Sequence, residues 1–218
     1  MATVTQPTDT FDSVADLVER LGGIPAHRIR LNPAPGTATE QDLIRINEQK
    51  DGGLFELIDG VLAGKAVASF ESRVAAVLIR LIGNFLVKNH LGIVFAPDAM
   101  FRMQAGTVRL PDVSVVTADQ FDGEKLKKEA ISSMQFDLAV EILSESNTKR
   151  EMEIKRTEYF GNGTKQVWIV NPRSCTVDVY CSMEEFATFG VNDEIDGGDV
   201  LPGFTLSIKQ WFNEAENV

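Results

Sequence analysis

The sequence contains little histidine and little cysteine, two of each among 218 residues. With only His27 and His90, histidine-rich zinc sites are excluded and a Ser-His-Asp triad is disfavoured. The chain also has no CxxC pair, no Walker loop and no GxGxxG motif. Any bound metal is therefore expected to be a hard ion held by oxygen ligands.

The two cysteines, Cys175 and Cys181, are expected to flank one strand. An extended strand holds residues six positions apart at roughly 20 Å, which is too far for a disulfide. We therefore predict two reduced cysteines, small core residues of a cytoplasmic protein.

Long apolar runs are absent as well. No stretch of 18 or more apolar residues occurs, so no membrane span is predicted. The N-terminus lacks the basic and apolar regions of a signal peptide. Residues 1–10 are polar and predicted to be disordered, and residues 11–218 are predicted to form a single domain.

Positive charge is scarce. The chain has 21 Lys and Arg against 32 Asp and Glu, a net charge of −11. Non-specific binding of nucleic acid depends on lysine and arginine that neutralise phosphates. The composition argues against a protein of that kind.

Apolar periodicity and caps give the predicted elements. Helices are predicted over residues 12–21, 40–49, 70–88, 148–160 and 209–214, with Thr39 and Ser69 as caps of the second and third. Strands are predicted over residues 27–31, 91–95, 100–104, 108–116, 136–143, 167–170 and 176–181. Asp59-Gly60 between apolar alternations predicts a hairpin over residues 53–67. Residues 121–133 are predicted to be a surface loop, and residues 184–199 to be turn-rich. This order indicates an α/β fold, a mixed sheet with helices packed on it.

The stretch 136–171 is predicted to be a β–α–β unit with chemistry at one strand end. Side chains alternate along a strand, so Glu141 ends an otherwise apolar strand. Asp112 begins another apolar strand. If the two strands are neighbours, Asp112 and Glu141 meet at one rim of the sheet.

Two adjacent carboxylates repel each other unless a cation lies between them. A divalent ion such as Mg²⁺ typically binds through one or two carboxylates and leaves room for a substrate phosphate. The alternative is that each acid caps a strand end or pairs with a surface base, and the residues alone leave both interpretations open.

Lys155 occupies a helix position where an apolar residue would be ordinary. Residues 148, 151, 152, 155 and 159 share one helix face, which places Lys155 between Met152 and Tyr159. A sheet-facing lysine is costly unless its ammonium has acidic partners, and Glu141 with a phosphate would serve. Alternatively, its stem packs on Tyr159 and its amine reaches water.

Two further acids are weaker candidates. Glu71 lies in the first turn of the predicted 70–88 helix, where a favourable interaction with the helix dipole is a sufficient explanation. Glu56 alternates with Leu54 and Ile58 in the hairpin, so its side chain is able to point inward.

An ordered set of motifs resembles the Uma family of "putative restriction endonucleases", of the PD-(D/E)XK nuclease-like superfamily. The motifs are Leu110-Pro111-Asp112-Val113, Val140-Glu141-Ile142-Leu143-Ser144, Lys155 with Tyr159 and Gly161, Val167-Trp168-Ile169-Val170-Asn171-Pro172, and the arm Phe55-Glu56-Leu57-Ile58-Asp59-Gly60. The match covers roughly residues 40 to 208.

The resemblance implies a restriction-endonuclease-like α-β-β-β-α-β core, about residues 54–181, preceded by helices and a hairpin. It also implies a metal, Mg²⁺ or Mn²⁺, held by Asp112, Glu141 and the carbonyl of Ile142. Leu143 stands where the superfamily has its lysine, and Lys155 takes over that role from the helix. Glu71, Glu56 and Tyr159 are additional candidates.

The expected function is metal-dependent hydrolysis of DNA phosphodiester bonds, by a protein able to act as a homodimer. The alternative is an inactive nuclease-like module that binds nucleic acid or protein. Alanine at Asp112, Glu141 or Lys155 is expected to abolish cleavage and to leave the fold intact. A DNA-binding surface is predicted from basic side chains, namely Arg102, Arg109, Lys125, Lys127 and Lys128.

Overall fold

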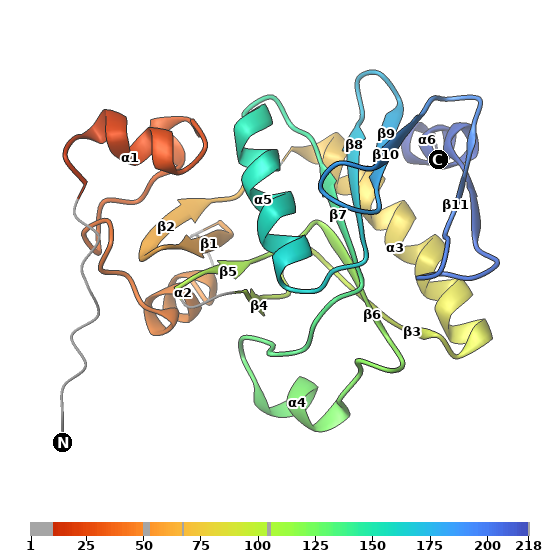
Figure 1. Cartoon of the computed structure of the whole chain (residues 1–218), viewed down its shortest axis with the longest axis horizontal. Helices are drawn as coiled ribbons and strands as arrows, with labels where there is room; N and C mark the ends of the chain where they lie inside the picture. Colours follow the sequence, from red (N-terminus) through yellow and green to blue (C-terminus); the bar gives the residue numbers. More distant parts are fainter. Residues whose placement is uncertain (1–10, 50–52, 67, 104–105, 218) are drawn as a thin grey trace.

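The computed structural model describes residues 11–49, 53–66, 68–103 and 106–217 (Figure 1). The predicted disorder of residues 1–10 lies outside this part of the chain.

Of the helices in the described residues, all but the fourth begin and end close to predicted boundaries. They are α1 (Val14–Arg20), α2 (Glu40–Asn47), α3 (Ser69–Asn89), α4 (Gly123–Lys128), α5 (Lys149–Gly161) and α6 (Ile208–Glu216), with a 3₁₀ turn at Ala26–Arg28. Capping boxes at Thr39 and Thr148 start α2 and α5, because each threonine satisfies a backbone N–H that has no partner within the helix. The N-cap of α3 is Ala68, one residue before the predicted Ser69.

The central sheet has six strands in the order β10-β9-β8-β7-β6-β3. These strands are β3 (Gly92–Phe95), β6 (Val113–Thr117), β7 (Leu138–Ile142), β8 (Gln166–Asn171), β9 (Thr176–Tyr180) and β10 (Phe186–Phe189). β7 and β8 run parallel, and α5 makes the crossover between them. The β–α–β unit predicted over residues 136–171 is therefore confirmed.

A second sheet has the order β2-β1-β5-β4. Its strands are β1 (Phe55–Ile58), β2 (Val61–Gly64), β4 (Phe101–Arg102) and β5 (Val108–Arg109), and a separate pair joins β11 (Glu194–Asp196) to β12 (Thr205–Ser207). Asp59 and Gly60 both have positive φ in the tight turn between β1 and β2, as a type I′ turn requires. The predicted hairpin is confirmed.

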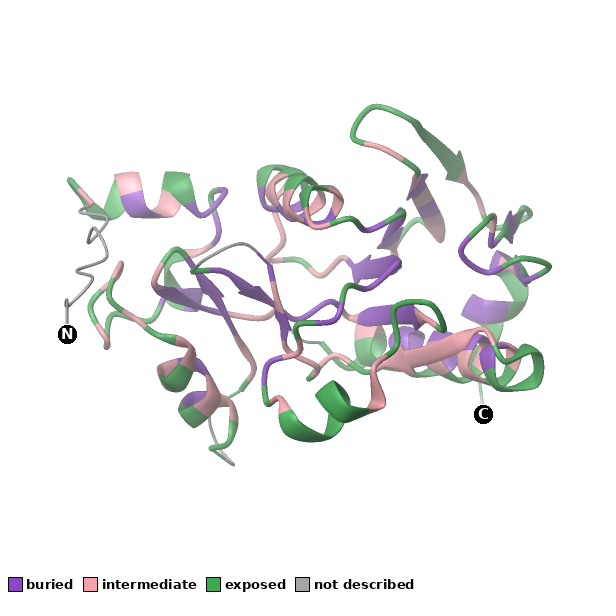
Figure 2. Ribbon diagram, turned by 60° about the horizontal axis from the view of Figure 1, so that its bottom comes forward, coloured by how far each residue is buried: buried purple, intermediate pink, exposed green. Residues whose placement is uncertain are grey.

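The central sheet lies between helices on both faces (Figures 1 and 2). Leu138, Val140 and Trp168 pack with α3 and α6 on one face. Ala139 and Ile169 pack beneath α5 on the other. This alternation brings residue 141 to the α5 side of the sheet.

The order α3, β3, β6, β7, α5, β8 reproduces the predicted α-β-β-β-α-β core in a mixed α/β fold. The two cysteines flank β9 as predicted, and both are free thiols. The prediction that they are core residues was wrong, because Cys175 is only half-buried and Cys181 is exposed. Within the described ranges, no helix is long and apolar enough to cross a membrane.

Four local predictions were wrong. The strand predicted over residues 108–116 is split at Pro111 into β5 and β6, which belong to different sheets, because proline has no N–H for a continuous ladder. Residues 27–31 contain the 3₁₀ turn and one bridge, from Ile29 to Ala63. The predicted loop 121–133 contains α4, which Asp122 caps. The turn-rich segment 184–199 contains β10 and β11, whose largely exposed side chains leave little apolar signal.

Candidate functional site

Asp112 and Glu141 lie at adjacent ends of β6 and β7. The two strands pair antiparallel with Val113 opposite Val140, and each acid stands one residue beyond that pair. The side chain of Asp112 also accepts a hydrogen bond from the backbone N–H of Ile142, with 2.8 Å between Oδ2 and N. The condition set by the sequence, that the two strands are neighbours, is met.

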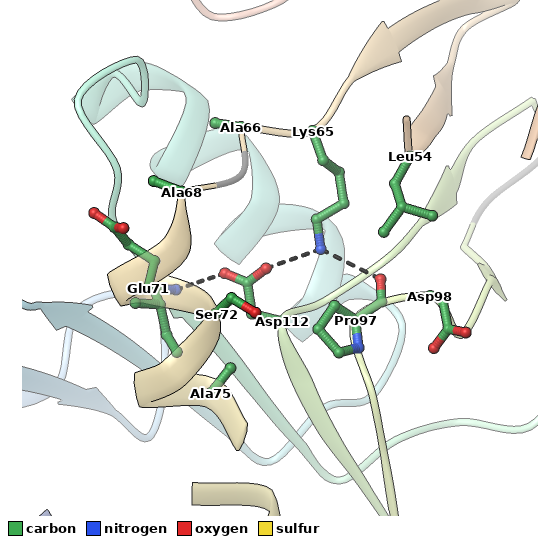
Figure 3. Close-up of a pocket in the computed structure, with 11 residues that line it drawn as sticks. Leu54, Lys65, Ala66, Ala68, Glu71, Ser72, Ala75, Pro97, Asp98 and Asp112 are labelled. Atoms are coloured by element: carbon green, nitrogen blue, oxygen red, sulfur yellow. Dashed lines mark hydrogen bonds and ion pairs between the residues drawn. The ribbon is translucent and has the colours of Figure 1, made fainter. Parts of the chain in front are cut away.

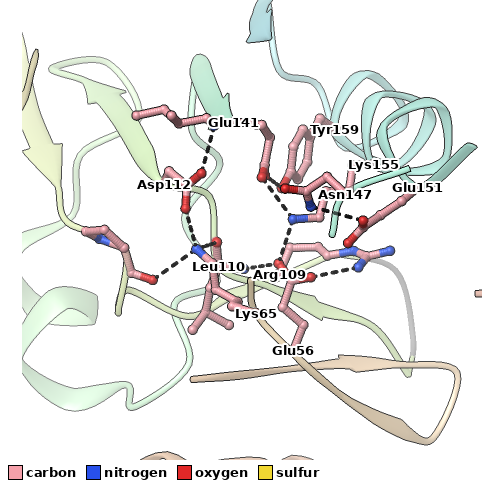
Figure 4. Close-up of polar contacts among 12 residues, drawn as sticks. Glu56, Lys65, Arg109, Leu110, Asp112, Glu141, Asn147, Glu151, Lys155 and Tyr159 are labelled. Carbon is pink, nitrogen blue, oxygen red and sulfur yellow. Dashed lines mark hydrogen bonds and ion pairs between the residues drawn. The ribbon is translucent and has the colours of Figure 1, made fainter. Parts of the chain in front are cut away.

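The Glu141 carboxylate is buried and both of its oxygens are engaged (Figure 4). Lys155 Nζ donates to Oε2 at 2.9 Å, and the Tyr159 hydroxyl donates to Oε1 at 2.5 Å. Both partners come from α5, one turn apart. Leu143 packs under the same helix. The position expected to hold a lysine therefore makes an apolar contact, and the amine near Glu141 is that of Lys155 on α5.

Glu56 completes the surroundings of Lys155. Its Oε1 lies 3.2 Å from Lys155 Nζ and accepts from the backbone N–H of Leu110 at 3.0 Å. Its Oε2 accepts from Arg109 at 2.9 Å, and Arg109 also binds Glu158. Glu56 points inward, and Lys155 is only 2 % exposed. The alternative of a lysine that reaches water is therefore excluded.

A second arginine fixes the start of α5. Arg28 donates two hydrogen bonds to the Glu151 carboxylate, at 2.6 and 3.1 Å. Glu151 is also the third residue of the α5 capping box and accepts from Asn147 at 3.0 Å. The residue three positions into α5 thus ties the helix to the N-terminal part of the chain.

Asp112 faces an open pocket of about 240 Å³ (Figure 3). The wall includes Glu71, Ser72, Asp98 and Ile142, together with Lys65, which follows β2. Lys65 Nζ lies 2.9 Å from Asp112 Oδ1. In Figure 3 the Glu71 carboxylate points away from Asp112, so Glu71 shares the pocket without contacting the aspartate.

The pKa values follow from burial and neighbouring charges. Burial raises the pKa of Glu141, and the negative charges of Asp112 and Glu56 raise it further. The positive charges of Lys155 and Lys65 act in the opposite direction but do not outweigh burial. Burial acts in the same direction on Glu56, but Lys155, Arg109 and Lys65 outweigh it and lower its pKa to about 2. Of these two carboxyls, Glu141 takes up a proton more readily. Burial and the charge of Glu141 raise the pKa of Tyr159, which keeps its hydroxyl as a donor.

The donor chemistry around Asp112 suits a hard cation. The Lys65 ammonium lies against Asp112 Oδ1 and the carbonyl oxygen of Leu110. Carboxylate and carbonyl oxygens are also the ligands that Mg²⁺ and Mn²⁺ prefer. Among the described residues, no three His, Cys, Asp or Glu side chains gather as a ready-made metal site. Glu141 lies on the neighbouring strand, and in this structure both of its oxygens are engaged by α5.

The profile of one protein family, described as "Uma2: Putative restriction endonuclease", matches residues 40–209. This chain belongs to the Uma2 family. The matched residues include the hairpin, the six strands of the central sheet, α3 and α5, and they end in the first turn of α6.

A solved structure has the same fold as this Uma2 chain. It is a "putative nuclease belonging to DUF820" from Anabaena variabilis ATCC 29413, with 19% sequence identity and a TM-score of 0.69. The match covers 81% of this chain and 98% of the other. A search of curated proteins gave no match. The family and the fold are those that the resemblance predicted.

The sequence identified some residues of this Uma2 site and missed others. It predicted that Asp112 and Glu141 meet at one rim with Lys155 near Glu141, and it gave Tyr159 and Glu56 as additional candidates. The structure brings these five residues together. Their catalytic and metal-binding roles stay predictions. It missed Lys65, Arg28 and the buried position of Arg109. The one available signal for Lys65 was its place at the end of the apolar hairpin arm.

The predicted basic surface is partly wrong. Arg109 is 2 % exposed and paired with Glu56 and Glu158, so it is not available to DNA in this structure. Arg102 pairs with Glu40. The lysines of α4 remain on an exposed helix.

Proposed function

We propose that this protein is a metal-dependent endonuclease that hydrolyses DNA phosphodiester bonds. The proposal rests chiefly on one observation, the gathering of Asp112, Glu141 and Lys155 from two strands and the crossover helix at one rim of the sheet. Membership of the Uma2 family supports it.

Asp112, Glu141 and the Ile142 carbonyl would hold a Mg²⁺ or Mn²⁺ ion. When bound, such an ion polarises a phosphoryl oxygen and lowers the pKa of a bound water. Tyr159 holds the Glu141 carboxylate in place. Lys155 brings a positive charge to the rim, where it stabilises negative charge that develops on the phosphate.

The pocket beside Asp112 gives a phosphate access to the rim from the α3 side. We further propose that the protein acts in the cytoplasm and as a homodimer, because two copies of one rim would allow both strands of a duplex to be cut.

The second candidate function is a nuclease-like binding module without catalysis. Two observations favour it: Glu141 has both oxygens engaged by α5, and the chain carries a net charge of −11. Metal binding separates the candidates, since a catalytic site requires an ion at Asp112 and Glu141.

The test is a cleavage assay on single-stranded, double-stranded and branched DNA, and on RNA, with Mn²⁺ or Mg²⁺. Asp112→Asn, Glu141→Gln and Lys155→Met are each expected to lower cleavage by at least about a hundredfold, as removal of a transition-state contact does. Lys209→Met, at an exposed lysine of α6 outside the predicted DNA-binding surface, is the matched control and should cleave normally.

Circular dichroism and thermal unfolding must accompany the assay, because Glu141 and Lys155 are buried. Equal cleavage by the wild type and the three rim variants would contradict the proposal. Absence of cleavage together with absence of Mn²⁺ binding by the folded wild type would favour the binding module.

A further inference from the structure

Lys65 lies in an oxygen-lined position that neither the family motifs nor the proposed mechanism uses. Its Nζ contacts three oxygens: Asp112 Oδ1 at 2.9 Å, the Leu110 carbonyl at 2.5 Å and the Pro97 carbonyl at 3.5 Å. The Lys65 side chain is 4% exposed. A buried ammonium surrounded by one carboxylate and two carbonyls occupies a site suited to a small cation.

This position coincides with the proposed metal ligand. Asp112 Oδ2 is engaged by the Ile142 N–H, and Oδ1 by Lys65 (Figure 4). An ion that binds Asp112 therefore meets a positive charge within about 3 Å of the same carboxylate. Two cations that share one carboxylate repel each other in a partly buried site.

We infer that Lys65 is a counter-ion that holds Asp112 in the metal-free protein and competes with the divalent ion for this carboxylate. The inference rests on the proposed function. Lysine suits this role because its charge sits on a flexible four-carbon stem. The ammonium is able to leave Asp112 without unfolding the hairpin.

The pocket provides a place for the displaced ammonium. It is an open space of about 240 Å³ next to Lys65, and its wall carries two further acids, Glu71 and Asp98 (Figure 3). Both acids line the same pocket, so the displaced ammonium would remain near negative charge.

The competition is measurable without any cleavage. Isothermal titration with MnCl₂ compares the wild type with Lys65→Met and Lys65→Gln, which remove the charge and keep most of the side-chain volume. Each variant is expected to bind Mn²⁺ about tenfold more tightly or better, because the ion no longer has to displace a cation. Lys165→Met is the control, since Lys165 is exposed and pairs with Asp137, and its affinity should equal that of the wild type.

Thermal unfolding provides a second readout. Without metal, Lys65→Met should melt at a lower temperature than the wild type, because Asp112 loses its partner. Saturating Mn²⁺ should then raise its melting temperature more than that of the wild type, since tighter binding stabilises the folded state further. Lys65→Gln gives the same comparison if Lys65→Met does not fold.

The outcomes separate the inference from the proposed function. If both Lys65 variants bind Mn²⁺ no more tightly than the wild type, the competition is overturned and the nuclease proposal still stands. Tighter binding without cleavage of any nucleic acid supports the competition and overturns catalysis. Asp112→Asn should abolish Mn²⁺ binding in the wild type and in Lys65→Met. Retained binding would place the ion elsewhere and overturn both the inference and the proposed function.

Discussion

At the scale of residues, this protein concentrates charge in a place that is mostly closed to water. The charge network is formed by buried and half-buried side chains, namely the acids Glu56, Asp112, Glu141, Glu151 and Glu158 and the bases Arg28, Lys65, Arg109 and Lys155. Removing one partner of a buried pair typically costs about 3–5 kcal/mol.

This burial corrects one expectation from the sequence. Alanine at Lys155 would leave Glu56 and Glu141 without their shared cation, so alanine variants are not expected to keep the fold intact. Substitutions that keep the shape, such as Lys155→Met, disturb packing least and are the better probes.

Glu56 gives a prediction about pH. Its pKa is about 2 in the folded protein, against an ordinary value of 4.5, because Lys155, Arg109 and Lys65 outweigh its burial. A lowered folded pKa contributes stability that is present above about pH 4.5 and is lost as the pH falls toward about 2. The contribution is on the order of 3 kcal/mol at neutral pH.

Urea unfolding of the wild type and Glu56→Gln at several pH values measures this contribution. The difference in unfolding free energy between the two proteins should be largest at pH 7 and shrink below about pH 4.5. Glu124→Gln, at an exposed position of α4, should show a small difference at every pH. A gap for Glu56→Gln that stays constant down to pH 3 would refute the assignment.

At the scale of elements, α5 makes the site. Its face carries Met152 and Tyr159 against the sheet and delivers Lys155 to Glu141. Its start is fixed by Thr148, which accepts from the Glu151 N–H at 3.0 Å and donates to the Gly22 carbonyl at 2.5 Å. The cap therefore sets how deep the lysine reaches.

Thr148→Ala is expected to lower the unfolding free energy by about 1–2 kcal/mol, as loss of an N-cap threonine does. Urea denaturation measures it. Thr157→Ala on the same helix is the matched control, since Thr157 is exposed and bonds only the Glu153 carbonyl among the contacts described. That change should stay within about 0.5 kcal/mol. Equal effects of the two substitutions would show that the cap contributes nothing special.

At the scale of the whole molecule, the C-terminal segment completes the core beneath the site. Trp211 of α6 is fully buried and donates from Nε1 to the Val74 carbonyl of α3 at 3.0 Å. α3 in turn packs under the central sheet and lines the pocket. The support of the rim therefore extends to the last helix.

Trp211→Ala should destabilise the protein by about 3–5 kcal/mol, because it opens a large cavity and leaves a carbonyl without its donor. Denaturation followed by circular dichroism measures the loss. Phe186→Ala, at a 56% exposed aromatic, is the control and should cost far less. Below the melting temperature, any cleavage per folded molecule should be unchanged in Trp211→Ala, since the rim residues are untouched.

Periodicity, caps and turn residues act locally, so the sequence was enough to predict most of the elements that carry the site. The Thr39 cap and the Asp59-Gly60 turn were predicted from neighbours a few positions away, and the structure has both. The cap at Thr148 was not predicted. Asp112, Glu141 and Lys155 stood out because each is a polar residue in an apolar pattern.

Several partners of these charges could not be predicted, because they come from segments far apart in the chain. Lys65 and Asp112 are 47 positions apart, and Arg28 and Glu151 are 123 positions apart, so no local pattern links them. The split at Pro111 sends β5 to one sheet and β6 to another, which brings Arg109 into the buried network and Asp112 to the pocket. A side chain's charge is written in the sequence, but the cation or carboxylate that it meets depends on how distant segments pack.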